Sequence, residues 1–222
     1  MTPAAIGLLS YFEQLHQARS FTALVLIFVG FVIAAFLTRT GAVLRLDTRL
    51  TSRLQGLRSA PLDRLMRVLT ILGDPPALFV AGGAGALLFW AVNQREAGIL
   101  TALSLLGLPL NYAIKELIRR PRPDQTLVRV LLPVTGRSFP SGHAMTATML
   151  YGFMAFVIWV HAGRGMPGTI ATLALVLTIL GVGLSRIYLG VHWFSDVMGG
   201  WTAGIFFLLI MASLYGALVS PQ

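Results

Sequence analysis

The amino-acid sequence predicts an all-α fold, an integral membrane bundle of six transmembrane helices. Three observations support this prediction: of the 222 residues, 56% are hydrophobic and only 11% are charged, and the mean hydropathy is +0.78. A soluble domain carries about 25% charged residues. The usual hydrated surface is therefore missing, and we expect lipid to surround most of the chain.

The apolar residues form six segments that approach the roughly 17–25 residues a helix needs to cross a bilayer. These segments are 21–38, 76–92, 97–114, 144–160, 169–184 and 197–219, and several are short for a full span. Residues 1–20 have no basic start and no clear cleavage site follows them. We therefore interpret the first segment as an uncleaved membrane helix rather than as a signal peptide. We expect residues 1–222 to form one membrane domain.

Residues 39–72 combine arginines with leucines at helical spacing. A helix would carry the leucines along one side and the arginines on the other, the leucines being Leu46, Leu50, Leu54 and Leu57. That pattern predicts amphipathic helices lying in the membrane interface between transmembrane helices one and two, with Pro61 separating two of them. The arginines could gather anionic lipid or could only anchor these helices, and the sequence leaves both readings open.

The charge balance indicates the kind of partner. The 17 Lys and Arg residues exceed the 8 Asp and Glu residues, which gives a net charge of +9. In a soluble protein this excess would suggest nucleic acid. Here the cations lie between apolar segments, so we expect membrane lipids and a phosphorylated lipid substrate instead, and no nucleic acid. The sequence has no cysteine for a thiolate site and no carboxylate cluster, so we expect no metal and no cofactor. The oligomeric state stays unknown.

Three polar clusters lie beside the membrane segments, and the first, residues 115–123, closes the third span. Its two prolines stop the helix from continuing. Lys115 offers a compact charge and Arg122 a planar fork, which together suit a multiply charged oxyanion. A basic flank that ends a membrane helix would look similar, and Arg119 and Arg120 need be no more than that.

The second cluster, residues 139–143, precedes the fourth span. Ser141 occupies the expected N-cap position, and Gly142 would let a ligand approach the backbone closely. The free N–H groups at that helix start make an anion site, in which His143 could give a proton to a leaving oxygen. An ordinary helix cap with an incidental histidine is the alternative.

The third cluster, residues 185–196, holds His192 and Asp196 four positions apart, so that on a helix they would share a face. A carboxylate on one imidazole nitrogen leaves the other unprotonated, as a nucleophile requires. Arg186 could bind the same anion. An Asp near the end of a membrane span is costly unless it is paired, which favours a functional role over a structural His–Asp pair.

Alternation of six spans brings the three clusters to one face of the membrane. Lys115 ends span three, His143 begins span four, and His192 and Asp196 lie between spans five and six. The arginine-rich stretch falls on the same face. This convergence predicts a single site within residues 115–196.

The three clusters resemble the signature of the type 2 phosphatidic acid phosphatase (PAP2) family, which shares a superfamily with the vanadium haloperoxidases. The signature reads Lys, six residues, Arg-Pro; then Pro-Ser-Gly-His; then Ser-Arg, five residues, His, three residues, Asp. Every fixed position is matched, by Lys115, Arg122, Pro123, Pro140, Ser141, Gly142, His143, Ser185, Arg186, His192 and Asp196. The resemblance runs from about residue 62 to residue 204.

The resemblance implies a metal-independent lipid phosphatase. His192 would attack phosphorus and form a phosphohistidine, Asp196 would orient it, and His143 would protonate the leaving oxygen and then activate water. The phosphate oxygens would be held by Lys115, Arg122, Ser141, Gly142 and Arg186. Undecaprenyl pyrophosphate, phosphatidic acid and phosphatidylglycerophosphate are the candidate substrates. A phosphotransferase with the same intermediate and a non-catalytic anion-binding transporter or scaffold are the alternatives.

Two arguments disagree about the side of the membrane on which the site lies. The catalytic face holds all the Lys and Arg residues except Arg19, Arg95 and Arg164, so the positive-inside rule would place the site in the cytoplasm. The resemblance implies a site that faces the periplasm or exterior of a bacterial inner membrane. We expect the outward placement, because catalysis and interfacial helices account for part of the charge.

Overall fold

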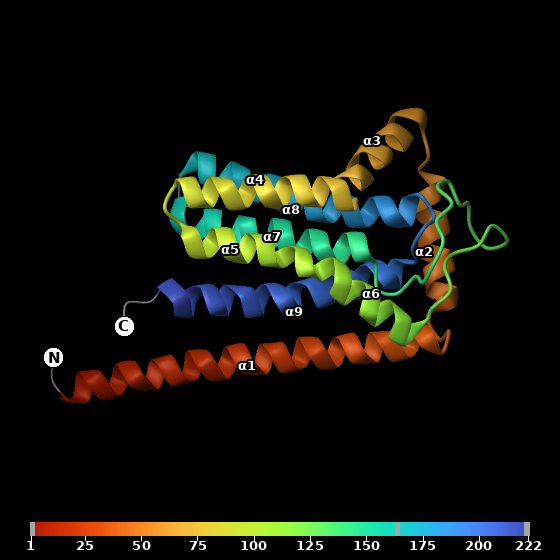
Figure 1. Cartoon of the computed structure of the whole chain (residues 1–222). Helices are drawn as coiled ribbons and strands as arrows, with labels where there is room; N and C mark the ends of the chain where they lie inside the picture. Colours follow the sequence, from red (N-terminus) through yellow and green to blue (C-terminus); the bar gives the residue numbers. More distant parts are fainter. Residues whose placement is uncertain (1–2, 163–164, 220–222) are drawn as a thin grey trace.

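The structure, a computed structural model, describes the backbone of residues 3–162 and 165–219 and the side chains from residue 21 onward within those ranges (Figure 1). The regular elements in these ranges are helices: α1 (Pro3–Arg39), α2 (Leu44–Gly56), α3 (Ala60–Ile71), α4 (Pro75–Ala91), α5 (Arg95–Leu103), the 3-10 helix η1 (Ser104–Leu106), α6 (Gly107–Ile118), α7 (Gly142–Ala162), α8 (Met166–Tyr188) and α9 (Phe194–Val219). The predicted all-α membrane bundle is confirmed.

Within the described ranges, five segments are long and apolar enough to cross a membrane: Phe21–Arg39, Arg95–Ile118, Gly142–Ala162, Met166–Tyr188 and Phe194–Val219. A sixth span requires α3 and α4 together, which are bent by 58° at their junction. The predicted second span corresponds to α4, which is only 17 residues long. The third is one span interrupted by η1, because the ring of Pro109 crowds the carbonyl of Leu105 four residues earlier.

The two amphipathic helices between the first spans are also present, as α2 and α3. The Ser59 hydroxyl caps α3 by accepting a hydrogen bond from Leu62 N at 3.4 Å. Figure 1 shows α2 lying across the end of the bundle, with α3 projecting beside it. One face of α2 was not predicted: Asp47, Thr51 and Gln55, spaced by four residues, are all buried. This polar stripe therefore points into the protein, next to the stripe of leucines.

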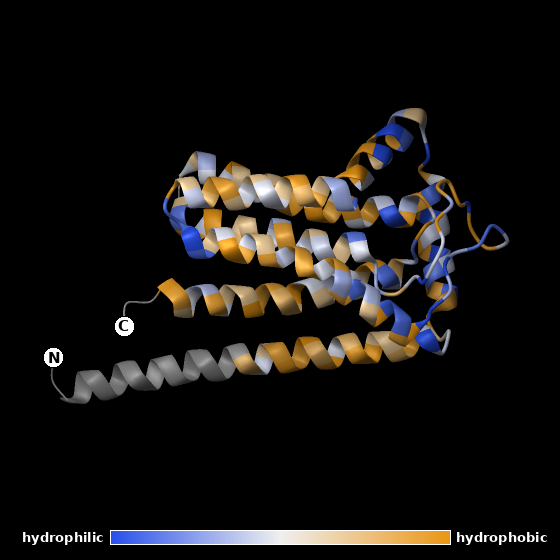
Figure 2. Cartoon of the chain, viewed as in Figure 1, coloured by the Kyte–Doolittle hydropathy of each residue, from blue (hydrophilic) through white to orange (hydrophobic). Residues whose placement is uncertain are grey.

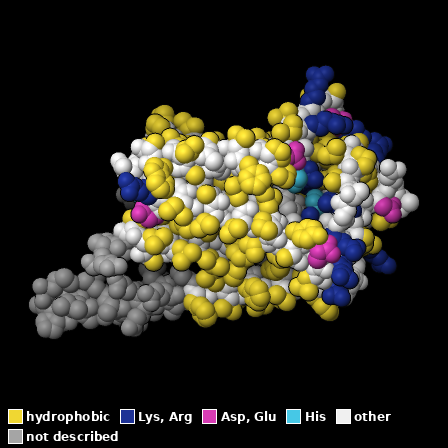
Figure 3. Space-filling view, in the orientation of Figure 1, with side chains coloured by type: hydrophobic (Ala, Val, Ile, Leu, Met, Phe, Trp, Pro, Cys, Tyr) yellow, Lys and Arg dark blue, Asp and Glu magenta, His cyan; other side chains and the backbone are white. Residues whose placement is uncertain are grey.

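Helix α7 forms the centre of the bundle. It supplies four of the ten buried residues of the main apolar cluster, Met145, Met149, Phe153 and Val157, which pack against α5 and α9. The other long helices expose large apolar side chains on their outer faces, as Figures 2 and 3 show. Hydrophilic residues gather around α2 and the loop between α6 and α7 at one end (Figure 2). That end holds the polar clusters.

Candidate active site

The three polar clusters meet at one end of the bundle, as the alternation of spans predicts. The end of α6, the start of α7 and the link from α8 to α9 are joined by direct contacts. Ser141 N donates a hydrogen bond to Asp196 O at 2.9 Å, and Arg122 Nη1 lies 3.2 Å from His192 Nε2. Figure 3 shows histidine side chains in a hollow of the apolar side face near this end, beside basic and acidic groups.

His192 lies at the floor of this site, with only 1% of its surface exposed. The shared helical face considered for His192 and Asp196 does not apply, because α9 begins only at Phe194. Just after the end of α8, Gly190 adopts a left-handed conformation with a φ of +70° and turns the backbone. The N–H groups of Val191 and His192 then donate hydrogen bonds to Arg186 O. The His192 ring is thus held by a tight turn.

The two ring nitrogens of His192 have different neighbours. Nδ1 lies 3.4 Å from Asp196 Oδ2, whereas Nε2 faces the Arg122 guanidinium. Because arginine only donates hydrogen bonds, Nε2 must be the acceptor, and the ring proton lies on Nδ1. Burial, and then the charges of Arg122 and Lys115, hold the pKa of His192 well below its usual range. The imidazole is therefore neutral, and the lone pair of its unprotonated Nε2 points toward Arg122.

Arg122 is fixed from the other side by backbone carbonyls. Its Nη1 donates to Val191 O at 2.7 Å and its Nε to Thr135 O at 3.1 Å. Burial lowers the pKa of this guanidinium from its ordinary value, an effect that Asp196 opposes. Arginine stays protonated in proteins, so Arg122 keeps its charge beside the His192 ring.

His143 lies in the first turn of α7, where the predicted helix start is confirmed. Ala144 N donates a long capping hydrogen bond of 3.5 Å to the Ser141 hydroxyl, and Gly142 is the first residue of the helix. His143 Nε2 lies 2.7 Å from Asp74 Oδ1, at the junction of α3 and α4. Gly73 permits this contact, because a Cβ there would come 2.8 Å from the His143 ring.

Lys115 and Arg186 complete the set of cations. Arg186 is 3% exposed and its Nη1 donates to the Thr70 hydroxyl at 2.5 Å. Its Nε is buried and has no hydrogen-bond partner among the described residues. Lys115 is partly buried at the end of α6, and its charge acts on His192 together with that of Arg186. A buried donor without a partner requires an explanation, and a bound oxyanion would supply one.

Comparisons with known proteins identify the arrangement. Residues 95–219, more than half of the chain, match the PAP2 superfamily. The chain belongs to this superfamily. It is 34% identical over 192 residues to phosphatidylglycerophosphatase B of Bacillus subtilis, a match that covers 82% of this chain and 91% of the relative. It is 28% identical over 181 residues to lipid A 1-phosphatase of Rhizobium etli, covering 71% of this chain and 73% of the relative.

A solved structure supports the same assignment. The crystal structure of a transmembrane PAP2-type phosphatidylglycerolphosphate phosphatase from Bacillus subtilis superimposes with a TM-score of 0.77 at 28% identity, over 90% of this chain and 98% of that one. The class of enzyme expected from the three clusters, a lipid phosphatase of the PAP2 superfamily, is thereby confirmed.

This PAP2 site includes residues that the sequence did not single out. Arg120 is not a flank: it is 4% exposed and its Nη1 donates to Asp196 Oδ1 at 2.5 Å. Its Nη2 donates to Asp47 Oδ2 at 2.6 Å. The Ser138 hydroxyl also bonds Asp196. Arg119, by contrast, is exposed, and with a φ of 57° it ends α6.

No group of three or more histidine, aspartate or glutamate side chains gathers in a metal-binding arrangement in the part of the chain that the structure describes. Positive charge acts on the His192 ring from Arg122, Lys115 and Arg186, three of the predicted phosphate-binding residues. Charge of this kind can stabilise a phosphoryl group in the manner of a preorganised anion site.

Proposed function

We propose that this protein hydrolyses a phosphorylated lipid without a metal ion, through a phosphohistidine formed on His192. The observation that carries this proposal is the environment of the His192 ring. Its Nε2 faces Arg122, a residue that can only donate, and its Nδ1 faces Asp196. A neutral imidazole with this tautomer has its lone pair where a phosphoryl group bound by Arg122 would lie.

In the first step the Nε2 lone pair of His192 forms a bond to phosphorus, and the bond from phosphorus to the lipid oxygen breaks. His143 gives its proton to that oxygen, so the leaving oxygen departs as a hydroxyl group. Asp74, 2.7 Å from His143 Nε2, stabilises the protonated ring before this transfer. Asp196 stabilises the positive charge that develops on the His192 ring.

In the second step water attacks the phosphohistidine. His143 takes the proton from water, the phosphorus–nitrogen bond breaks, and inorganic phosphate leaves. In both steps the equatorial oxygens of phosphorus carry negative charge. Lys115, Arg122, Arg186, the Ser141 hydroxyl and the Gly142 amide surround the place of these oxygens, and the free Arg186 Nε would gain its missing partner.

We propose phosphatidylglycerophosphate as the first substrate to test, with undecaprenyl pyrophosphate and phosphatidic acid as the others. The relative with 34% identity is a phosphatidylglycerophosphatase, and the hollow in Figure 3 opens on the apolar side face, where a bilayer lipid could reach it. A purified-protein assay of phosphate release from each lipid would rank them. Transfer of label to an added alcohol, without free phosphate, would instead favour a phosphotransferase.

We expect phosphate release to be unchanged, within about twofold, after treatment with EDTA, because the proposed site neutralises phosphate with Lys and Arg side chains. The measurement is the initial rate of phosphate release before and after chelation. Loss of activity that a divalent cation restores would contradict the metal-free mechanism.

We further propose that the site faces outward from a bacterial inner membrane. The chain has no native cysteine, so single cysteines report the side of the membrane without background. Gln125 is exposed at the catalytic end, and Ala162 is exposed at the far end of α7. We expect a membrane-impermeant maleimide to label Gln125→Cys in intact cells and Ala162→Cys only after permeabilisation. The reverse pattern would place the site in the cytoplasm, as the positive-inside rule suggests.

A further inference from the structure

A chain of buried charges connects the interfacial helix α2 to the carboxylate beside His192. Asp47, Arg120 and Asp196 have side-chain exposures of 1%, 3% and 0%. The Arg120 guanidinium bridges the two carboxylates, with 2.6 Å to Asp47 Oδ2 and 2.5 Å to Asp196 Oδ1. Only the planar fork of arginine can hold two carboxylates in this way.

Asp47 also fixes the start of α9, the helix that carries Asp196. Its Oδ1 accepts a hydrogen bond from Ser195 N at 2.8 Å, and its Oδ2 accepts one from the Ser195 hydroxyl at 2.7 Å. The same hydroxyl accepts from Arg120 Nη1 at 2.7 Å. Asp47 therefore reaches Asp196 by two routes, through the guanidinium and through the backbone of the neighbouring residue.

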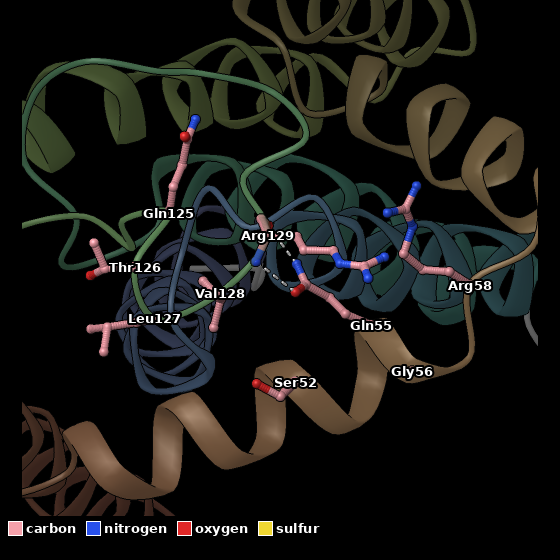
Figure 4. Close-up of a pocket in the computed structure, with 9 residues that line it drawn as sticks. All are labelled: Ser52, Gln55, Gly56, Arg58, Gln125, Thr126, Leu127, Val128 and Arg129. Atoms are coloured by element: carbon pink, nitrogen blue, oxygen red, sulfur yellow. Dashed lines mark hydrogen bonds between the residues drawn. The ribbon is translucent and has the colours of Figure 1, made fainter.

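The position of Asp47 is held at the other end of α2 as well. Gln55 Nε2 donates to Arg129 O at 2.7 Å and to Tyr188 O at 3.0 Å, and Arg129 N donates to Gln55 Oε1 at 3.1 Å. Figure 4 shows the two bonds between Gln55 and Arg129 at one wall of a polar cleft of about 560 Å³ between α2 and residues 125–129. Helix α2 is thus docked rigidly over the site by buried polar contacts.

The charges of Asp47, Arg120 and Asp196 decide how strongly Asp196 can accept the Nδ1 proton of His192 in a hydrogen bond. Two carboxylates share one guanidinium, so the group of Asp47, Arg120 and Asp196 carries a net charge of −1 on the Nδ1 side of the His192 ring. Without Asp47 the whole charge of Arg120 would fall on Asp196, and Asp196 would be a weaker acceptor for the Nδ1 proton. In the dry interior such charge-assisted hydrogen bonds are strong. Loss of the Asp47 charge should therefore weaken the hydrogen bond from His192 Nδ1 to Asp196.

From this geometry we infer that Asp47 is a positioning residue for catalysis: by sharing Arg120 it keeps Asp196 negative and oriented toward the nucleophile. The inference rests on the proposed role of His192. It also assigns α2 a part in the chemistry, although the polar partners of the His192 and His143 rings lie outside this helix. Asp47 is the only acidic residue between Arg39 and Arg58, a stretch otherwise suited to anionic lipid.

The test compares Asp47→Asn with Asp47→Ala. Asparagine keeps an oxygen that can accept from Ser195 N but loses the charge, whereas alanine loses both. We expect Asp47→Asn to lower kcat roughly tenfold to a hundredfold with KM within about threefold, and Asp47→Glu to recover most of the rate. The Asn variant should fold, because it leaves Arg120 and Asp196 as a neutral buried pair.

Asp63→Asn is the matched control, since Asp63 lies on the other interfacial helix and pairs with Arg58 at 2.8 Å. We expect its kcat to stay within about twofold of the unchanged protein. Rates are expressed per folded protein, measured by size-exclusion recovery in detergent. Normal kcat in Asp47→Asn together with a loss in Asp47→Ala would reduce Asp47 to a helix cap and overturn the inference. Phosphate release by the unchanged protein tests the proposed function separately.

Discussion

Replacement of His192 by alanine is expected to lower phosphate release by about a thousandfold or more, while the protein still folds. The variant removes the ring nitrogen that faces Arg122, so the proposed phosphorus–nitrogen bond cannot form. The loss should appear in kcat with every lipid substrate. Recovery of monodisperse protein in detergent measures folding, and initial rates of phosphate release measure activity.

His161→Ala is a matched control for this variant. His161 lies at the opposite end of the bundle, where its Nε2 is 2.6 Å from the Tyr215 hydroxyl. We expect this variant to keep its rate within about twofold and to lose some thermal stability, because a partly buried hydrogen bond contributes about 1 kcal/mol. Comparable turnover in His192→Ala and the unchanged protein would exclude His192 as nucleophile. Anion transport that survives in a phosphatase-dead His192→Ala would favour the transporter hypothesis.

Much of this architecture could be predicted from local features of the sequence. Long apolar segments predicted the spans, since the bilayer sets their length. Lys115 and Arg122 suggested an oxyanion site, although a basic flank that ends a membrane helix would look similar. Helix boundaries near prolines were harder. The interruption of the third span at η1 depends on Pro109, and the bend between α3 and α4 leaves the second span divided.

The supporting residues could not be predicted, because they are joined over long sequence separations. Asp74 in Gly-Asp-Pro-Pro suggests only a turn, yet it reaches His143 69 residues later. Arg120 follows Lys115 in a run of cations that resembles a membrane flank, and only the docking of α2 places Asp47 against it, 73 residues away. A signal did exist: Asp47, Thr51 and Gln55 form a polar stripe beside the leucines.

His143→Gln should separate the two chemical steps. Loss of the His143 imidazole is expected to lower steady-state phosphate release by roughly a hundredfold to ten-thousandfold, the usual contribution of a general acid and base. The effect on each step depends on the leaving group. A lipid diphosphate expels a lipid phosphate, which needs less protonation than a lipid alkoxide, so the first step should survive better than the attack by water.

With a labelled lipid diphosphate, His143→Gln is therefore expected to accumulate label on the protein, whereas a lipid monophosphate should leave it unlabelled. The label should be stable to base and released by acid, because these are the properties of a phosphorus–nitrogen bond. It should be absent when His192→Ala is added.

Asp74→Asn provides a graded comparison: the imidazole of His143 remains but loses the carboxylate 2.7 Å away, so a smaller loss of phosphate release, about tenfold, is expected. If His143→Gln stops turnover without trapping label from either lipid, His143 is required for the first step even with a diphosphate leaving group, which contradicts the expected difference between the two lipids. If it turns over normally, the Asp74–His143 pair is structural, and the proton for the leaving lipid must come from elsewhere in the site.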